Sequence, residues 1–300
     1  MPSSTPPSSC DKDPTICRAD NIHVAIPASL ARLSVPPTAR RSLNRCNLPT
    51  EALGSFAFQL TPCALSLDGV LPLHQPLFDR LDTLDSAPER ACVFRTYMNA
   101  HFMLDDAPAL GLSENVRLDR SRMDYLRLLR GWLFDSEGRE GAILKAWVES
   151  RFGLLTRYHR GPLGAEDSAS RSGFEQEVAA GLYSTAGLEA QVDLLYSWTQ
   201  YELARRLHGR THLQLYRGCS DPRALREKHA LDDGRRVVEL NNLSSFSANA
   251  ERADEFGDRV FSCATPMPKI LAFSGLMPGL LQGENEYLVI GGIAAITIEY

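Results

Sequence analysis

The sequence has no apolar run that approaches the roughly 20 residues needed to span a bilayer. It also has no excess of basic residues, because 32 Lys and Arg are outnumbered by 37 Asp and Glu, which gives a net charge of −5. A negatively charged chain is poorly suited to bind nucleic-acid phosphates or anionic lipid. We therefore expect neither a membrane span nor a nucleic-acid partner.

Cysteines are few and irregularly placed. The seven cysteines are odd in number and include no C-x-x-C pair, which argues against a disulfide framework. The first 20 residues, MPSSTPPSSCDKDPTICRAD, are rich in Pro and Ser and lack the apolar segment of a signal peptide. These features predict reduced thiols, a cytoplasmic location and a disordered leader over residues 1–20.

Several common enzyme signatures are missing. We find no G-x-G-x-x-G after a strand, no Walker phosphate loop, no H-E-x-x-H and no G-x-S-x-G. His208 and His212 are four residues apart, but Gly209 lies between them and no clear third ligand follows, so no metal site is expected. Gly291 and Gly292 are interpreted as a turn that ends a strand.

The residues that are present divide the chain into two regions. With 300 residues, of which 44% are hydrophobic and 23% charged, the chain can bury a sizeable core. Apolar residues recur at i, i+3 and i+4 within 121–134, 139–152 and 187–210, which predicts helices, the first of them capped by Ser121. Residues 21–209 are therefore expected to be mainly helical.

From residue 210 onward the pattern changes to short segments rich in β-branched and aromatic residues, separated by turn residues. A short helix at 249–257 interrupts them. The expected strands are residues 212–218, 235–247, 258–265, 286–292 and 294–300. This layout predicts an α+β fold, in which a mainly helical N-terminal half packs on a β-rich core of residues 210–300.

Three polar elements accompany these strands, in a fixed order. Arg217 ends the first strand, in the string LYRG; Ser245 and Ser247 end the second; Glu284 and Glu286 precede the final apolar run. Each has an ordinary explanation by itself, as a surface charge, a helix cap or a solvated strand end. Their combination is what points to a catalytic site.

In this order and spacing, the three elements resemble the mono-ADP-ribosyltransferase family, in its Arg–Ser–Glu branch. The resemblance implies that Arg217, with Gly218 beside it, contacts the phosphates of NAD. It implies that Ser245 and Ser247 support the nicotinamide-binding core, and that Glu286 is the catalytic carboxylate. Phe246 stands where many members of the family have Thr, which favours Ser245 over Ser247.

Longer strings carry a narrower resemblance. FRTYMNAHF, LNNLSSFS, ERADEFGD and GENEYLVIGG look like the dinitrogenase reductase ADP-ribosyltransferase family. The helix that ends in Phe-Gly adds Phe256 to the residues implied to bind NAD. The resemblance further implies an arginine of the nitrogenase iron protein as acceptor, reversible inactivation of nitrogen fixation, and a PII-type nitrogen-signalling protein as regulator.

The chemistry explains why two glutamates would be needed. Breaking the bond between nicotinamide and ribose C1′ leaves positive charge on the ribose, which a carboxylate such as Glu286 can stabilise. The guanidinium of Arg217 suits the pyrophosphate. Glu284 lies two residues from Glu286, hence on the same face of an extended segment, where it can orient and deprotonate an acceptor arginine.

Alternatives to this interpretation remain at the level of sequence. The chain could be an NAD glycohydrolase, a transferase with a different acceptor, or a binding module without activity. The segment 273–283, FSGLMPGLLQG, carries Leu276, Met277, Leu280 and Leu281 between glycines. It is either a buried turn or an exposed loop that recognises the target protein.

Overall fold

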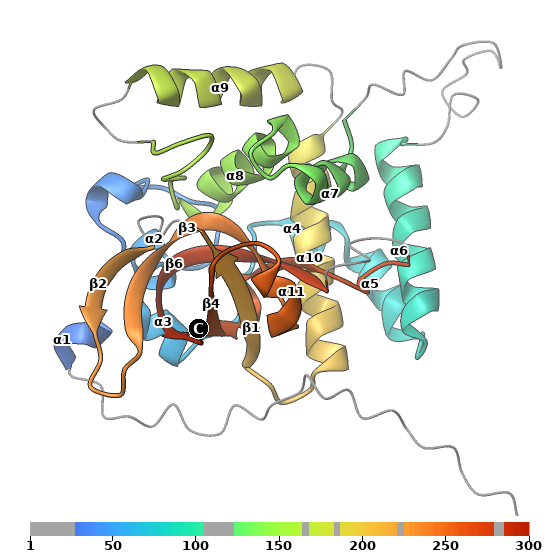
Figure 1. The fold of residues 1–300 in the computed structure, drawn as a ribbon. Coiled ribbons are helices and arrows are strands. Elements are labelled where there is room, and N and C mark those ends of the chain that lie inside the picture. Colours follow the sequence, from blue (N-terminus) through green and yellow to red (C-terminus); the bar gives the residue numbers. More distant parts are fainter. Residues whose placement is uncertain are drawn as a thin grey trace, which may run out of the picture.

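The computed structural model describes residues 28–104, 123–163, 168–182, 187–220, 225–278 and 285–299. Helices occupy the first two thirds of the chain and strands the last third (Figure 1). The expected α+β fold is confirmed. The predicted leader, residues 1–20, lies outside the described residues.

The helices pack around and above the sheet (Figure 1). They are α1 (Ala28–Ala31), η1 (Pro37–Ala39), α2 (Thr50–Leu53), α3 (Phe56–Leu60), α4 (Val70–Leu73), α5 (Gln75–Asp82), α6 (Ala87–Phe102), α7 (Tyr125–Phe134), α8 (Arg139–Phe152), α9 (Ser168–Leu182) and α10 (Leu188–Arg206). None of the helices in the described ranges is long and apolar enough to cross a membrane.

Apolar periodicity located α8 and α10 well, but the predicted start of α7 was wrong. The helix begins at Tyr125, and its N-cap is Asp124, whose carboxylate accepts a hydrogen bond from the backbone N–H of Arg127 at 2.7 Å. Ser121, the cap expected from the sequence, lies outside the described residues. A carboxylate at the first turn also interacts favourably with the helix dipole, so Asp124 is a strong alternative cap.

The strands form one antiparallel sheet. They are β1 (His212–Cys219), β2 (Arg226–Ala230), β3 (Arg236–Ser247), β4 (Arg259–Pro266), β5 (Ile270–Phe273) and β6 (Glu286–Ile298), with α11 (Ala250–Asp254) and η3 (Met267–Lys269) between them. The strand order is β2-β3-β1-β4-β6-β5, and an additional pairing of β3 with β6 closes β3, β1, β4 and β6 into a small barrel. Strands β2 and β5 were not expected from the sequence.

The interpretation of Gly291 and Gly292 as a strand-ending turn was wrong. The two segments expected at 286–292 and 294–300 form the single strand β6, and both glycines lie inside it. Here Asn241 and Asn242 of β3 bulge opposite Gly291, because the pairing passes from Leu240–Gly292 to Leu243–Ile290. A Cβ on Gly291 would collide with the carbonyl of Asn241, so glycine permits the close approach of the bulge.

Side chains alternate along β6, so this strand packs against the helical region on one face and fills the barrel on the other. Leu288 and Ile290 belong to the large core shared with the helices, whereas Val289 belongs to the core inside the barrel. In the large core, Trp198 of α10 stacks on Phe94 of α6 with a centroid distance of 3.8 Å. The helical region therefore covers one face of the sheet and leaves the barrel to fill its own interior.

All five cysteines within the described ranges are free thiols, namely Cys46, Cys63, Cys92, Cys219 and Cys263. Cys10 and Cys17 lie outside those ranges.

Candidate functional site

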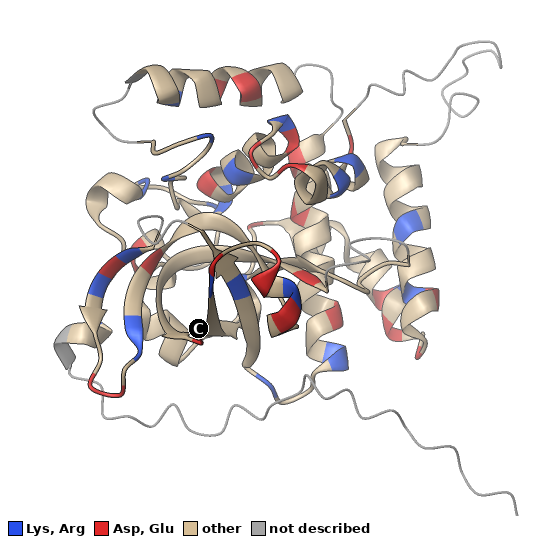
Figure 2. Cartoon of the chain, viewed as in Figure 1, with Lys and Arg blue, Asp and Glu red and all other residues tan. Residues whose placement is uncertain are grey.

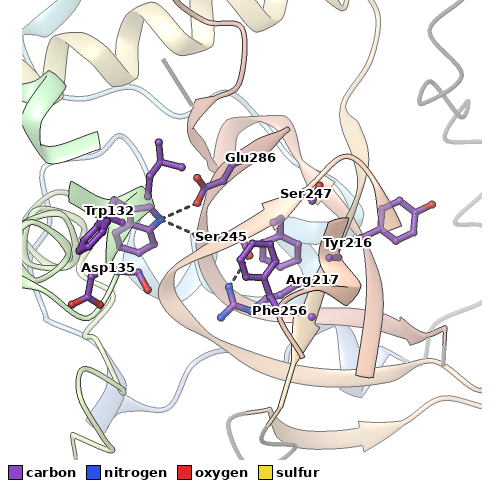
Figure 3. A pocket seen from close by; sticks show the side chains of 14 residues that line it. Trp132, Asp135, Tyr216, Arg217, Ser245, Ser247, Phe256 and Glu286 are labelled. Carbon is purple, nitrogen blue, oxygen red and sulfur yellow. Dashed lines mark hydrogen bonds between the residues drawn. The ribbon is translucent and has the colours of Figure 1, made fainter. Parts of the chain in front are cut away.

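A cavity of about 330 Å³ lies between the barrel and the C-terminal end of α7. It is lined by Trp132, Leu133, Phe134, Asp135, Ser136, Tyr216, Arg217, Gly218, Ser245, Phe246, Ser247, Ala253, Phe256 and Glu286. Figure 3 shows the side chains of these residues around the cavity. The three elements that the sequence placed far apart on β1, β3 and β6 thus share one cavity.

Glu286 is the first residue of β6 and is 4% exposed. It pairs with Ser247 of β3, so the strand register places the carboxylate beside the serines. Its Oε1 accepts a hydrogen bond of 3.1 Å from the indole Nε1 of Trp132 (Figure 3). The preceding residue, Asn285, has a φ of +47° and turns the chain into the strand. Glu284 lies outside the described residues.

Ser245 and Ser247 point to the same side of β3 because side chains alternate along a strand. Phe246, between them, is buried in the barrel core. The hydroxyl of Ser245 accepts a hydrogen bond of 2.8 Å from Trp132 Nε1. The hydroxyl of Ser247 accepts a hydrogen bond of 3.1 Å from the backbone N–H of Asn249, the N-cap of α11. Ser247 therefore also fixes the entry into the helix that follows.

Arg217 lies on β1, and its guanidinium is directed toward β3. Its Nη1 donates a hydrogen bond of 2.7 Å to the carbonyl oxygen of Ser245, and the guanidinium lies 5.9 Å from the ring centroid of Phe246. Burial lowers the pKa of Arg217 below its ordinary value, while the nearby Cys219, Glu137 and Glu286 act in the opposite direction. The group nevertheless stays cationic, because arginine is effectively never deprotonated in proteins.

Gly218 and Phe256, which were also predicted to bind NAD, lie at the rim of the cavity. A Cβ on Gly218 would collide with the carbonyl of Ala253, so glycine lets α11 pack directly against β1. That contact brings Phe256, two residues after the end of α11, to the cavity mouth, where its side chain is 54% exposed. An exposed ring beside a cavity offers a flat face for a planar group such as nicotinamide or adenine.

Trp132, Phe134 and Asp135 line the cavity but were not anticipated. They belong to the C-terminal end of α7, in the region expected to serve only as scaffold. The sequence offers no signal for Trp132, because a tryptophan on an apolar helix face is typical of a core position. Phe134 is 94% exposed, although it ends a helix whose apolar residues Tyr125, Leu128, Leu129 and Trp132 are buried.

An ion-pair network lies behind this wall of the cavity. Lys145 of α8 is 1% exposed, and its Nζ donates to Glu137 at 2.6 Å. Burial lowers the pKa of Lys145 and the ion pair with Glu137 opposes that shift. His159 Nδ1 lies 3.2 Å from the same Nζ, and its Nε2 lies 3.0 Å from Glu177 of α9. These contacts hold the turn between α7 and α8 in place.

Of the pair His208 and His212, the second has structural contacts. His212 Nε2 lies 2.5 Å from the carbonyl oxygen of Gln59, and its Nδ1 lies 2.8 Å from Thr211 Oγ1. No cluster of three or more His, Cys, Asp or Glu suited to a metal occurs among the described residues. Leu276 and Met277 are buried, which favours the buried-turn interpretation for that part of the segment 273–283. Leu280 and Leu281 lie outside the described ranges.

Charges outside the cavity are of both signs. Figure 2 shows acidic and basic residues interspersed along the helices and strands of the described ranges. Within the cavity, the guanidinium of Arg217 and the carboxylate of Glu286 lie on opposite sides of Ser245. This arrangement can bind a ligand with an anionic part and stabilise a cation that forms elsewhere in the same ligand.

Comparison with known proteins yields two matches. The model of the family described as "Dinitrogenase reductase ADP-ribosyltransferase (DRAT)" matches residues 43–298. The NAD(+)--dinitrogen-reductase ADP-D-ribosyltransferase of Rhodospirillum rubrum is 36% identical over 269 residues, which cover 88% of this chain and 97% of that protein. No solved structure matches significantly.

Proposed function

The chain belongs to the dinitrogenase reductase ADP-ribosyltransferase family, and from this premise we propose that it transfers ADP-ribose from NAD to an arginine of dinitrogenase reductase, the nitrogenase iron protein. The modification would inactivate nitrogen fixation reversibly. The observation that carries the proposal for the site is the gathering of Arg217, Ser245 and Glu286 around one cavity.

In the donor half of the reaction, Arg217 binds the pyrophosphate, and Gly218 and Phe256 border the bound dinucleotide. Ser245 and Ser247 support the nicotinamide end. The bond between ribose C1′ and the nicotinamide nitrogen breaks, and the electron pair leaves with neutral nicotinamide. Glu286 faces the ribose and stabilises its oxocarbenium character, as carboxylates do in glycoside hydrolysis.

In the acceptor half, a guanidine nitrogen of the target arginine attacks C1′ and forms a new C–N bond. The proton that this nitrogen loses goes to Glu284. Arginine needs such a base because its pKa above about 12 leaves very little neutral guanidine at neutral pH. The two glutamates therefore act on different substrates.

The test of this proposal is to mix the chain with purified dinitrogenase reductase and NAD labelled in the adenylate. We expect the label on the dinitrogenase reductase band and equimolar release of nicotinamide. Nicotinamide release without a labelled band would instead identify an NAD glycohydrolase. A label that appears only when other proteins are supplied would identify a different acceptor.

We further propose a PII-type nitrogen-signalling protein as regulator, as the family resemblance implies, and a cytoplasmic location. The effect of such a regulator can be measured by mixing the two purified proteins and following the rate at which dinitrogenase reductase is labelled. No increase or decrease at saturating regulator would remove that part of the proposal.

A further inference from the structure

One hydrogen-bond donor from the helical region is shared by two residues of the proposed catalytic site. The indole Nε1–H of Trp132 is directed at Ser245 Oγ at 2.8 Å and at Glu286 Oε1 at 3.1 Å. These partners lie 113 and 154 residues further along the chain. Trp132 is 2% exposed and Glu286 is 4% exposed, so water has little access to replace the bond.

The position of the indole is itself closely determined. Gly131 precedes it on α7, and a Cβ there would collide with the side chain of Glu140 on α8, so the two helices are in close contact. The Nζ of Lys145 lies 5.8 Å from the centroid of the Trp132 ring, within the range of a cation–π contact. Lys145 is held in turn by its ion pair with Glu137. The Trp132 ring therefore packs against a charged group whose position is fixed.

A glutamate side chain has three rotatable bonds, and a carboxylate must face the developing cation to stabilise it. Preorganisation of this kind is supplied by neighbours that fix the rotamer before the reaction begins. The Trp132 N–H is a donor only, and it holds one oxygen of the Glu286 carboxylate. The same N–H draws the Ser245 hydroxyl toward Glu286.

We propose that Trp132 is a positioning residue for the reaction, which orients the Glu286 carboxylate and the Ser245 hydroxyl from the helical region. This inference rests on the proposed function. It makes α7 part of the active site, although the residues that carry the family resemblance around the cavity all lie on the barrel or just after α11. Trp132 acts through Glu286 and Ser245, and it need not touch the substrate.

The test is Trp132→Phe, which keeps a buried aromatic ring and removes the N–H. We expect kcat for ADP-ribosyl transfer and for nicotinamide release to fall roughly 10- to 100-fold, a usual range when a hydrogen bond that orients a reacting group is lost. KM for NAD should change less than about threefold, because groups that bind the phosphates are untouched.

The matched control is Trp147→Phe. Trp147 is also buried on a neighbouring helix, and its Nε1 donates to a carboxylate, Asp193 Oδ1, at 2.8 Å. It does not line the cavity. Both variants should lose similar thermal stability, but Trp147→Phe should keep the kcat of the unaltered chain. Equal kcat in the two variants would overturn the proposal.

A second replacement guards against a Trp132→Phe chain that folds poorly. The analogue 3-benzothienylalanine at position 132 has nearly the shape of tryptophan, with sulfur in place of the N–H. Loss of kcat with normal melting temperature supports positioning by the hydrogen bond, and retention of more than a third of kcat overturns it. Absence of transfer by the unaltered chain would count against the proposed function instead.

Discussion

Arg217 donates a hydrogen bond of 2.7 Å from Nη1 to the carbonyl oxygen of Ser245. The bond links β1 to the end of β3, and so joins two of the three elements on which the family resemblance depends. One edge of the guanidinium is thereby used to hold the strand that carries the serines. The rest of the group remains at the cavity, where we propose that it binds the NAD pyrophosphate.

Replacing Arg217 by Lys should therefore affect binding more than chemistry. Lysine keeps the charge but loses the planar fork that can serve the carbonyl and a phosphate together. We expect KM for NAD to rise roughly tenfold and kcat to fall less than that, because grip on the phosphates is mostly uniform binding. Steady-state kinetics at varied NAD measure both. Arg236→Lys, on the exposed start of β3, is the control, and an unchanged KM with a collapsed kcat would contradict the assigned role.

Replacing Glu286 by Gln keeps the shape of the side chain and removes the charge that faces the ribose. We expect transfer and NAD hydrolysis both to fall by roughly two or more orders of magnitude, as when a key electrostatic contact is lost. NAD binding, measured by titration, should weaken far less. Turnover above a third of that of the unaltered chain would remove Glu286 from the mechanism.

Replacing Glu284 by Gln should separate the two activities. The acceptor arginine loses its anchor and base, whereas water needs neither, so protein labelling should disappear while slow nicotinamide release persists. The measurement follows labelled dinitrogenase reductase and free nicotinamide in the same reaction. If both activities fall equally, the two carboxylates act together on the donor, and Glu284 has no separate role with arginine.

The ion pair between Arg90 and Glu202 should be important for stability. The two side chains are 4% and 0% exposed, with Arg90 Nε 2.5 Å from Oε1, and Glu202 also pairs with Arg206 at 2.7 Å. Glu202→Gln leaves buried positive charge uncompensated, and we expect a loss of about 3–5 kcal/mol in the free energy of unfolding. The exposed pair Arg252–Glu255 is the control, because Glu255→Gln should cost less than about 1 kcal/mol. Urea denaturation of both variants measures the difference, and equal losses would contradict the prediction.

Lys269 should make the stability depend on pH. Burial lowers its pKa from 10.5 to about 8, and its Nζ donates to the carbonyl of Gly291 at 2.7 Å. Above pH 8 the unfolded chain binds this proton and the folded chain does not, so the contribution of Lys269 to stability rises with pH. Burial also raises the pKa of Cys263 from 9.0 to about 11, which opposes the rise above pH 9.

The useful window is therefore pH 8 to 9. There the difference in unfolding free energy between the unaltered chain and Lys269→Met should change by up to about 1.4 kcal/mol in favour of the unaltered chain, the slope for one proton. Denaturant titrations at pH 8.0, 8.5 and 9.0 measure it. A difference that stays constant across the window would mean that Lys269 keeps its ordinary pKa in the folded chain.

The structure also shows which sequence signals were sufficient. Apolar periodicity identified α8 and α10, because a helix buries one stripe of its surface wherever it packs. It gave no warning that Trp132 would bond to Ser245 and Glu286, because periodicity tells which face is buried and not what that face contacts. The start of α7 was misplaced because Ser121 and Asp124 are both acceptable caps in sequence.

The errors in the sheet have a related cause. Gly291 and Gly292 look like a turn when β6 is considered by itself, and the need for glycine arises only from the bulge of Asn241 and Asn242 on β3. Strand β2 was missed because its residues Arg226–Ala230 are exposed and polar. Such an edge strand buries too little to show an alternating pattern.

The sequence by itself determined the α+β class, the division into a helical N-terminal and a β-rich C-terminal region, and the residue types at Arg217, Ser245 and Glu286, because local periodicity and short motifs are properties of neighbouring residues. Only the tertiary structure decided that these three residues share a cavity, and that Trp132 from the helical half closes one side of it. Strand register and helix packing set those relationships. They join residues from 28 to 154 positions apart, for which no local pattern carries information.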